Sequence, residues 1–284
     1  MKQQVPIESK AEPLISCRTL AKCLERKEQI NIFDCSWELP SAGKKALAFT
    51  NWQQERIPSS TFLDIELDLQ NGEFQRFLTH CGIKSVDEQI ALYDSIGMWS
   101  VAKGYWMFLM FGFKNVSIVS GGLPEWKKFG LPIERGAKDQ IQGEAKEDKN
   151  SLQENFSIVN KQLLSEFKDI NAGKIVDLRS SDRFNGVPGS EPRAAIPSGH
   201  IPGSVNIPFS TFRTENGQFL LPTPELERLF VKNLGSNWKE QNLIFSCGSG
   251  VTACIGFLAA QMLEKDSEVS VYSGSWTDYC QRIQ

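Results

Sequence analysis

One short segment, Cys247-Gly248-Ser249-Gly250-Val251-Thr252, combines a nucleophilic side chain with two glycines. It follows an apolar run typical of a buried strand and precedes a helical pattern, so Cys247 is predicted at the turn from strand to helix. The glycines allow the backbone to turn inward, and its N–H groups then converge at the start of the helix. Such a ring of donors favours an anion. We therefore expect Cys247 to react as a thiolate.

The remaining cysteines and histidines narrow the possible chemistry. The chain has 7 cysteines and none of them form a CxxC pair, so neither a disulfide framework nor a zinc ribbon is predicted. Only 2 histidines are present, which offers few metal ligands, and we expect no metal and no cofactor. Five cysteines are interpreted as inert apolar side chains: Cys17, Cys23, Cys35, Cys81 and Cys254.

The elements expected to position Cys247 occur twice along the chain. Strand-like segments at 30–34, 90–94 and 115–122 correspond in order to segments at 174–177, 243–247 and 268–274. These apolar runs do not alternate cleanly and are separated by helical patterns, which predicts parallel strands buried on both faces. The predicted fold class is α/β, with two tandem domains that each contain a parallel sheet flanked by helices.

The length of 284 residues also favours two domains. A stretch dense in charge and amide groups, without aromatic residues, predicts a linker at 141–155. The first domain is then residues 1–140 and the second is 156–284. Asp94 occupies the place of Cys247 in the first repeat, so we expect the first domain to be catalytically inactive.

Composition excludes some partners. The net charge of -3 and the lack of a basic block argue against nucleic acid. The most apolar stretch, Tyr105 to Phe113, is too short to cross a bilayer and is predicted to be a buried helix, so no membrane partner is expected. The first 13 residues lack a signal or transit pattern, which predicts a cytoplasmic protein, with additional mitochondrial residence left open.

Residues 247–253 resemble the active-site loop of the 3-mercaptopyruvate sulfurtransferases, which are tandem-domain members of the rhodanese superfamily. The resemblance extends over nearly the whole chain and includes segments 34–37, 121–126, 199–204 and 274–276. It implies that Cys247 takes sulfur from 3-mercaptopyruvate as a persulfide, with release of pyruvate. The sulfur then passes to a thiol acceptor such as thioredoxin, from which hydrogen sulfide can be released.

The resemblance also implies roles for residues around Cys247. Arg183 and Arg193 resemble a pair of arginines that binds the substrate carboxylate, for which the planar guanidinium is well suited. Glu191 is expected to support them, and Ser249 is the expected proton donor or relay. The remaining expected substrate-binding residues belong to the loop: Gly248, Gly250, Val251 and Thr252. Relatives back the serine with a histidine, which segment 64–72 lacks.

Three alternatives stay open at this point. The first is a thiosulfate sulfurtransferase, although such relatives carry basic residues directly after the cysteine, where this chain has Gly248 and Ser249. The second is a cysteine phosphatase, whose loop would close with an arginine at the position of Ala253. The third is a non-catalytic binding module that keeps the fold, against which the intact Cys247 loop argues.

Overall fold

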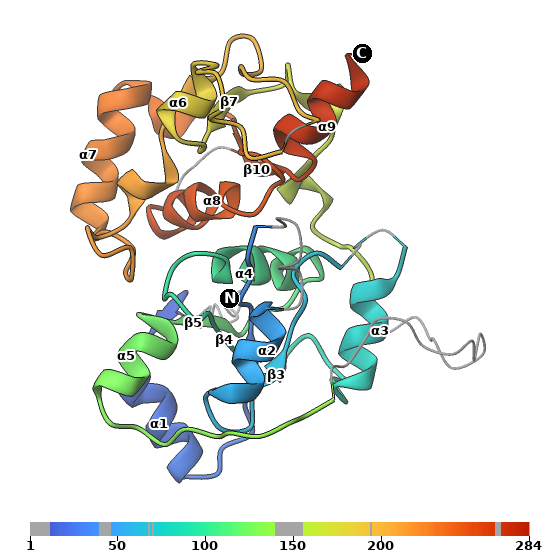
Figure 1. Cartoon of the computed structure of the whole chain (residues 1–284), viewed down its shortest axis with the longest axis vertical. Helices are drawn as coiled ribbons and strands as arrows, with labels where there is room; N and C mark the ends of the chain where they lie inside the picture. Colours follow the sequence, from blue (N-terminus) through green and yellow to red (C-terminus); the bar gives the residue numbers. More distant parts are fainter. Residues whose placement is uncertain are drawn as a thin grey trace, which may run out of the picture.

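The computed structural model describes residues 12–39, 47–67, 69, 71–139, 156–193, 195–264 and 268–283. These residues form two α/β domains, the first in blue to green and the second in yellow to red in Figure 1. The predicted linker at 141–155 lies outside the described residues. Within the described ranges, no helix has the length and apolar character needed to cross a bilayer.

The first domain contains a parallel sheet with strand order β1-β5-β4-β2-β3. Its strands are β1 (Leu14–Ile15), β2 (Asn31–Asp34), β3 (Thr61–Phe62), β4 (Ile90–Tyr93) and β5 (Val116–Val119). Its helices are α1 (Cys17–Glu25), α2 (Leu47–Gln54), α3 (Glu73–His80), α4 (Val101–Met110) and α5 (Gly122–Lys128).

The second domain repeats this topology with the order β6-β10-β9-β7-β8, again with every neighbouring pair parallel. Its strands are β6 (Leu164–Ser165), β7 (Lys174–Asp177), β8 (Val205–Asn206), β9 (Leu243–Ser246) and β10 (Val269–Tyr272). Its α-helices are α6 (Ser181–Phe184), α7 (Thr223–Leu234), α8 (Ala253–Met262) and α9 (Ser275–Arg282). Its 3-10 turns are η1 (Lys161–Leu163), η2 (Phe167–Asp169), η3 (Phe209–Phe212) and η4 (Trp238–Glu240).

The predicted fold class is confirmed. All residues of the central strands β4, β5, β9 and β10 are buried, as the apolar runs without alternation predicted. The short outer strands β1, β3, β6 and β8 were not predicted, because two residues are too few to produce a periodic pattern.

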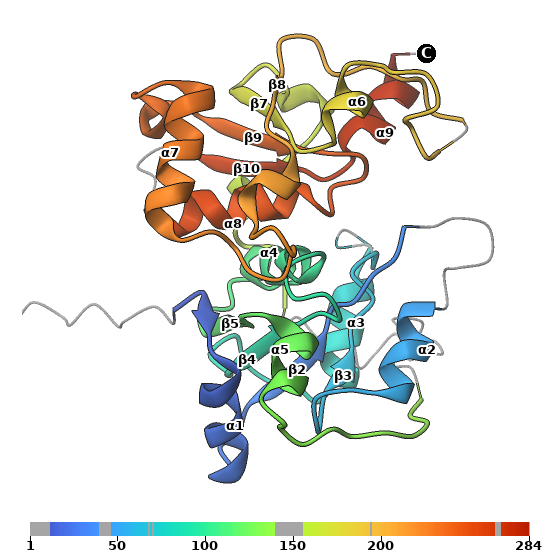
Figure 2. The ribbon, with the colours of Figure 1, turned by 60° about the vertical axis from the view of Figure 1, so that its left-hand side comes forward.

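The two domains meet through α4 and α8, which lie against each other in both views of the ribbon (Figure 1 and Figure 2). A single apolar cluster contains residues of both domains, including Trp106 from α4 and Ile255 from α8. Residues 253–260 of α8 are buried all round. The reason is that α8 packs on its own sheet and on the partner domain at once.

The ends of β2 and β7 differ in charge pairing. Asp177 at the end of β7 pairs with the buried Arg179, at 2.6 Å between Oδ2 and Nη2. Asp34 occupies the same place in β2, but Ser36 replaces the arginine and donates its backbone N–H to Asp34 Oδ1 at 2.8 Å. Burial raises the pKa of Asp34 to about 6, in spite of hydrogen bonds that favour its ionised form.

This difference predicts a pH effect on stability. Because the pKa of Asp34 is higher in the folded than in the unfolded chain, the folded state binds more protons between about pH 4 and pH 6. The contribution of Asp34 to the free energy of unfolding therefore falls as the pH rises through this window. Asp34→Asn, which cannot ionise, should gain stability relative to the unchanged protein between pH 4.5 and pH 7 in urea denaturation. The exposed Asp182→Asn is the control, and an equal gain in both variants would contradict the prediction.

Candidate active site

Cys247 lies directly after β9, buried at the start of the turn into α8. Its own N–H donates to Ser275 Oγ at 3.0 Å, and the carbonyls of Cys247 and Gly248 accept from Trp276 and Thr277 on α9. In contrast, the N–H groups of residues 248–253 donate to no oxygen of the described part of the chain. The loop therefore keeps a set of unused donors next to the sulfur atom.

The equivalent loop of the first domain holds an anion. Asp94 follows β4 as Cys247 follows β9, and its buried carboxylate accepts five backbone N–H groups. The donors are Ile96 (2.9 Å) and Gly97 to Oδ1, and Trp99 (2.8 Å), Ser100 (2.8 Å) and Val101 (3.0 Å) to Oδ2. Because the two loops are equivalent in the repeat, the second is suited to hold negative charge on the sulfur of Cys247.

Both glycines of the Cys247 loop allow close approaches, and a backbone contact requires glycine at position 250. Gly250 has a positive φ of 75°, and a Cβ there would lie 2.3 Å from the carbonyl oxygen of Ser273. At Gly248 a Cβ would lie 2.7 Å from Arg183 Nη2 and 2.9 Å from Arg193 Nη1. The two predicted arginines are thus brought together against the residue that follows the nucleophile.

The predicted loop residues surround Cys247 in different ways. Arg193 Nη2 donates to Ser249 Oγ at 2.9 Å, so the predicted proton relay contacts a predicted carboxylate-binding residue. Val251 is buried, and Thr252 lies at the N-terminus of α8, where its carbonyl accepts from Ile255 N–H at 3.1 Å.

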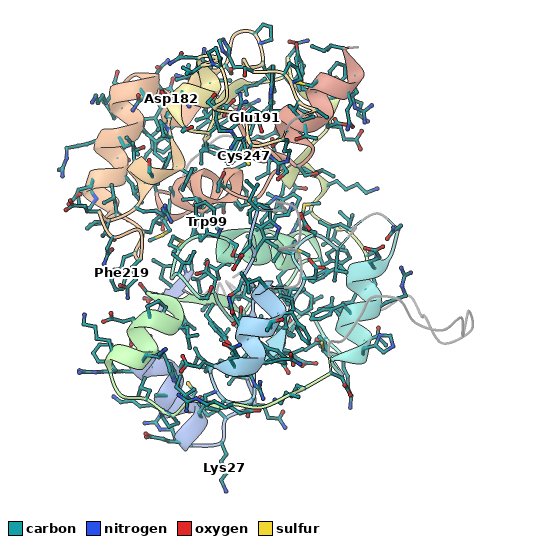
Figure 3. The ribbon with its side chains drawn as sticks, viewed as in Figure 1. Lys27, Trp99, Asp182, Glu191, Phe219 and Cys247 are labelled. Atoms are coloured by element: carbon teal, nitrogen blue, oxygen red, sulfur yellow. The ribbon has the colours of Figure 1, made fainter. Side chains whose placement is uncertain are left out.

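Glu191, labelled in Figure 3, connects the arginines of the site. Its carboxylate accepts from Arg183 Nε at 3.1 Å and Nη2 at 2.9 Å, and lies 3.8 Å from both Arg179 Nη1 and Arg193 Nη1. With Asp177 included, two carboxylates face three arginines. One positive charge is therefore left over beside the nucleophile.

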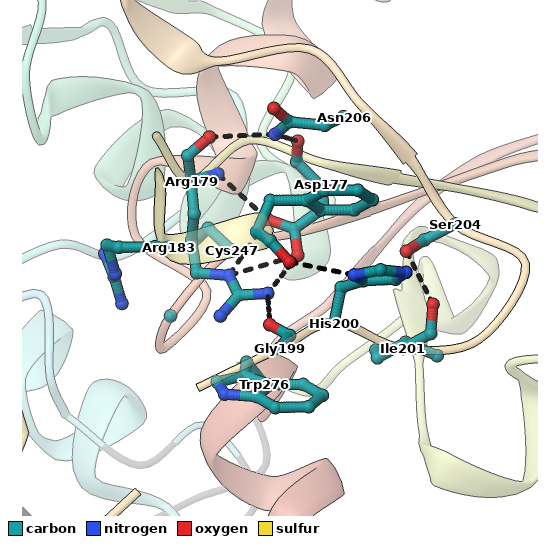
Figure 4. Close-up of polar contacts among 12 residues, drawn as sticks. Asp177, Arg179, Arg183, Gly199, His200, Ile201, Ser204, Asn206, Cys247 and Trp276 are labelled. Atoms are coloured by element: carbon teal, nitrogen blue, oxygen red, sulfur yellow. Dashed lines mark hydrogen bonds and ion pairs between the residues drawn. The ribbon is translucent and has the colours of Figure 1, made fainter. Parts of the chain in front are cut away.

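Arg179 is the residue of this cluster that the sequence analysis missed. It is fully buried, bonds to both oxygens of Asp177, donates to Gly199 O at 2.7 Å and lies over the ring of Trp276 (Figure 4). The sequence did contain a signal that could have identified Arg179. It is a charged residue two positions after a buried strand, at the sheet edge where the site lies. His200 nearby donates from Nδ1 to Phe184 O at 2.8 Å and stacks on the Phe184 ring, which is a structural role.

The first domain contributes one wall of the site. A cavity of about 440 Å³ lies between the domains, lined by Glu66, Lys103 and Trp106 on one side and by Ser249, Val251 and Ser273 on the other, among other residues. The sequence analysis did not identify Glu66 or Lys103 as site residues. Trp99 packs edge-on against Phe209 of the second domain, with ring centroids 5.1 Å apart, and so holds the domains together near the cleft.

The other cysteines are in surroundings that disfavour a thiolate. Burial raises the pKa of Cys17 to about 11 and that of Cys81 and Cys254 to about 12. Burial also raises the pKa of Cys23, Cys35 and Cys280. Cys23 and Cys81 are only partly buried.

The chain was compared with known proteins. It matches the rhodanese-like domain family at residues 17–129 and 160–282. It is 33% identical to the 3-mercaptopyruvate sulfurtransferase of Mus musculus, over 95% of this chain and 93% of that protein. It is 29% identical to the thiosulfate sulfurtransferase of Rattus norvegicus, over 95% and 92%. Among solved structures, SseA from Escherichia coli, described as a 3-mercaptopyruvate sulfotransferase, is similar with a TM-score of 0.74 and 26% identity, over 94% of this chain and 99% of that one.

The geometry predicts selective alkylation. Iodoacetamide at pH 7 should modify Cys247 before any other cysteine, because burial raises the pKa of the other six, whereas the unused N–H groups of the loop lie beside the sulfur of Cys247. Peptide mass spectrometry of the native protein locates the label, and Cys247→Ser should remove the fast phase. Fast labelling at another cysteine, with Cys247 unmodified, would contradict the prediction.

Proposed function

The chain belongs to the rhodanese family and is a sulfurtransferase, and on that premise we propose that it takes sulfur from 3-mercaptopyruvate onto Cys247 and passes it to a thiol. The observation that carries this proposal is the loop around Cys247, whose N–H groups match those that hold the Asp94 carboxylate in the first domain. A persulfide is an anion of similar reach, so the same donors can stabilise it.

In the proposed reaction the Cys247 thiolate attacks the thiol sulfur of the substrate, and the carbon–sulfur bond breaks. The substrate carboxylate binds to Arg183 and Arg193, which lie against Gly248 and carry the surplus positive charge of the cluster around Glu191. The electron pair of the broken bond leaves on pyruvate as an enolate. Ser249, whose hydroxyl accepts from Arg193, is the proposed donor or relay of the proton that the enolate takes up.

The residues after Cys247 favour 3-mercaptopyruvate over thiosulfate. Thiosulfate carries two negative charges close to its transferable sulfur, and Gly248 and Ser249 provide no cation there. The available cations, Arg183 and Arg193, approach Gly248 with guanidinium groups that suit a planar carboxylate. Thiosulfate sulfurtransferases are also among the similar proteins, so this donor is the alternative.

The proposed acceptor is a thiol that enters the cleft and attacks the outer sulfur of the Cys247 persulfide. Thioredoxin is the proposed protein acceptor, and a second thiol of the acceptor would then release hydrogen sulfide. We propose the cytoplasm as the site of this reaction, and a similar plant protein is named as mitochondrial.

The choice of donor is tested by mutation of the carboxylate site. Arg183→Ala should raise KM for 3-mercaptopyruvate about 10- to 100-fold, because it removes a charge-assisted pair, while transfer from a preformed persulfide to dithiothreitol stays within about twofold. Pyruvate release measures the first step and hydrogen sulfide release the second. The exposed Arg228→Ala on α7 is the matched control and should behave as the unchanged protein.

Intact-protein mass tests the intermediate. After incubation with 3-mercaptopyruvate, the protein should gain the mass of one sulfur atom, and Cys247→Ser should not. A protein that is loaded by thiosulfate at a higher kcat/KM than by 3-mercaptopyruvate would reject the proposed donor but keep the persulfide. Absence of any added sulfur with either donor would reject the proposed chemistry.

A further inference from the structure

Lys103 is a buried cation at the interface between the domains. It belongs to α4, is 8% exposed, and its ammonium lies 4.2 Å from the ring centre of Trp106. Within the described ranges this ammonium forms no ion pair and donates no hydrogen bond, and only the backbone N–H of Lys103 donates, to Ser100 O at 2.9 Å. An ammonium buried in this way costs several kcal/mol unless its charge is used, so its position requires a reason other than stability.

The side chain of Lys103 lines the same cavity as Ser249, and this cavity adjoins the Cys247 loop. Lys103 lies on its first-domain wall, whereas Arg193 contacts Ser249 from within the second domain. Burial lowers the pKa of Lys103, and the negative charge of Glu66 acts in the opposite direction. Burial therefore makes Lys103 a better proton donor than an exposed lysine, and its position on the cavity wall places it in the space that Ser249 also lines.

We propose that Lys103 supplies the proton that the pyruvate enolate takes up when the carbon–sulfur bond of 3-mercaptopyruvate breaks. This assignment rests on the proposed function and names the source of a proton that the reaction requires.

The protons and electrons of the step balance within the site. The Cys247 thiolate forms a bond to the substrate sulfur, and the pair from the broken carbon–sulfur bond moves to the methylene carbon. That carbon takes a proton from the Lys103 ammonium and becomes the methyl group of pyruvate. The new persulfide still carries the hydrogen of the substrate thiol, and it returns this proton to the neutral Lys103 amine. The persulfide anion and the ammonium are thereby restored as a pair of opposite charges.

Other side chains are poorer sources of the proton. Both histidines are occupied elsewhere, His80 at Arg76 O on α3 and His200 at Phe184 O. The guanidinium groups of Arg183 and Arg193 do not dissociate at neutral pH. Ser249 can relay a proton but, as a neutral hydroxyl, must be resupplied by a stronger acid. Lys103 is the ammonium that lines the cavity with it.

Two variants separate proton donation from charge and from packing. Lys103→Met keeps the length of the side chain and its contact with Trp106 but has no proton to give. Lys103→Arg keeps the charge but does not release its proton. Lys239→Met is the matched control, because Lys239 also lies over a tryptophan, Trp238, at 5.6 Å from the ring centre and away from the cleft.

Each variant is assayed for two reactions of Cys247. Pre-steady-state release of pyruvate from 3-mercaptopyruvate requires protonation of carbon. Loading of Cys247 with sulfur from inorganic polysulfide, which is measured as the intact-protein mass, requires no protonation of carbon. We expect pyruvate release to fall about 100-fold in both Lys103 variants, with polysulfide loading within about threefold of the unchanged protein.

Three results would overturn the assignment. Pyruvate release within about threefold of normal in Lys103→Met shows that the proton comes from elsewhere. Restored release in Lys103→Arg shows that only the charge matters, and a parallel loss of polysulfide loading shows that the residue acts on Cys247 or on the fold. Failure of the proposed function would be seen separately. In that case the protein without substitutions would load sulfur from polysulfide but release no pyruvate from 3-mercaptopyruvate.

Discussion

A ring of backbone N–H groups at a strand-to-helix turn must face an anion, and much of this structure follows from that constraint. In the first domain the ring is filled permanently by the Asp94 carboxylate, which accepts five N–H groups. In the second domain the side chain at the same place is Cys247, and the donors of its loop remain unused by the described residues. The same local geometry therefore holds the Asp94 carboxylate in one domain and surrounds the sulfur of Cys247 in the other. The two anions differ in one respect. The Asp94 carboxylate is part of its side chain and cannot leave, whereas the outer sulfur of the proposed Cys247 persulfide can be transferred.

The first domain is also part of the site. Its Asp94 loop fixes the start of α4, and α4 packs on α8, which begins at the end of the Cys247 loop. A substitution of Asp94 would therefore be expected to alter the cleft, because α4 and α8 connect the two loops. The same helix carries Lys103 to the cavity that Ser249 lines. Domain pairing thus supplies both the wall of the site and a charge that the second domain does not carry on that side.

The sequence was sufficient for the features that depend on local patterns. The repeated apolar runs predicted two parallel sheets, and the glycines after Cys247 predicted a tight turn, where Gly250 has a positive φ. It was insufficient for contacts between distant segments. Arg179 and Lys103 look like solvated charges in a sequence, because the carboxylate or cavity that each faces is brought close only by the fold.

In the proposed reaction, negative charge moves from Cys247 to the leaving enolate. Positively charged side chains of both domains lie around this region. On one side, Arg179, Arg183 and Arg193 exceed Asp177 and Glu191 by one positive charge. On the other side, Lys103 faces the cavity from the first domain. During attack, negative charge moves from the sulfur of Cys247 to the carbon of the leaving enolate, while the substrate carboxylate stays ionised. A cation on a single side could stabilise only the start or the end of this movement, whereas cations on both sides stabilise the transition between them. The tandem arrangement therefore places positive charge on two faces of the cleft, although the Cys247 loop itself contains no lysine or arginine.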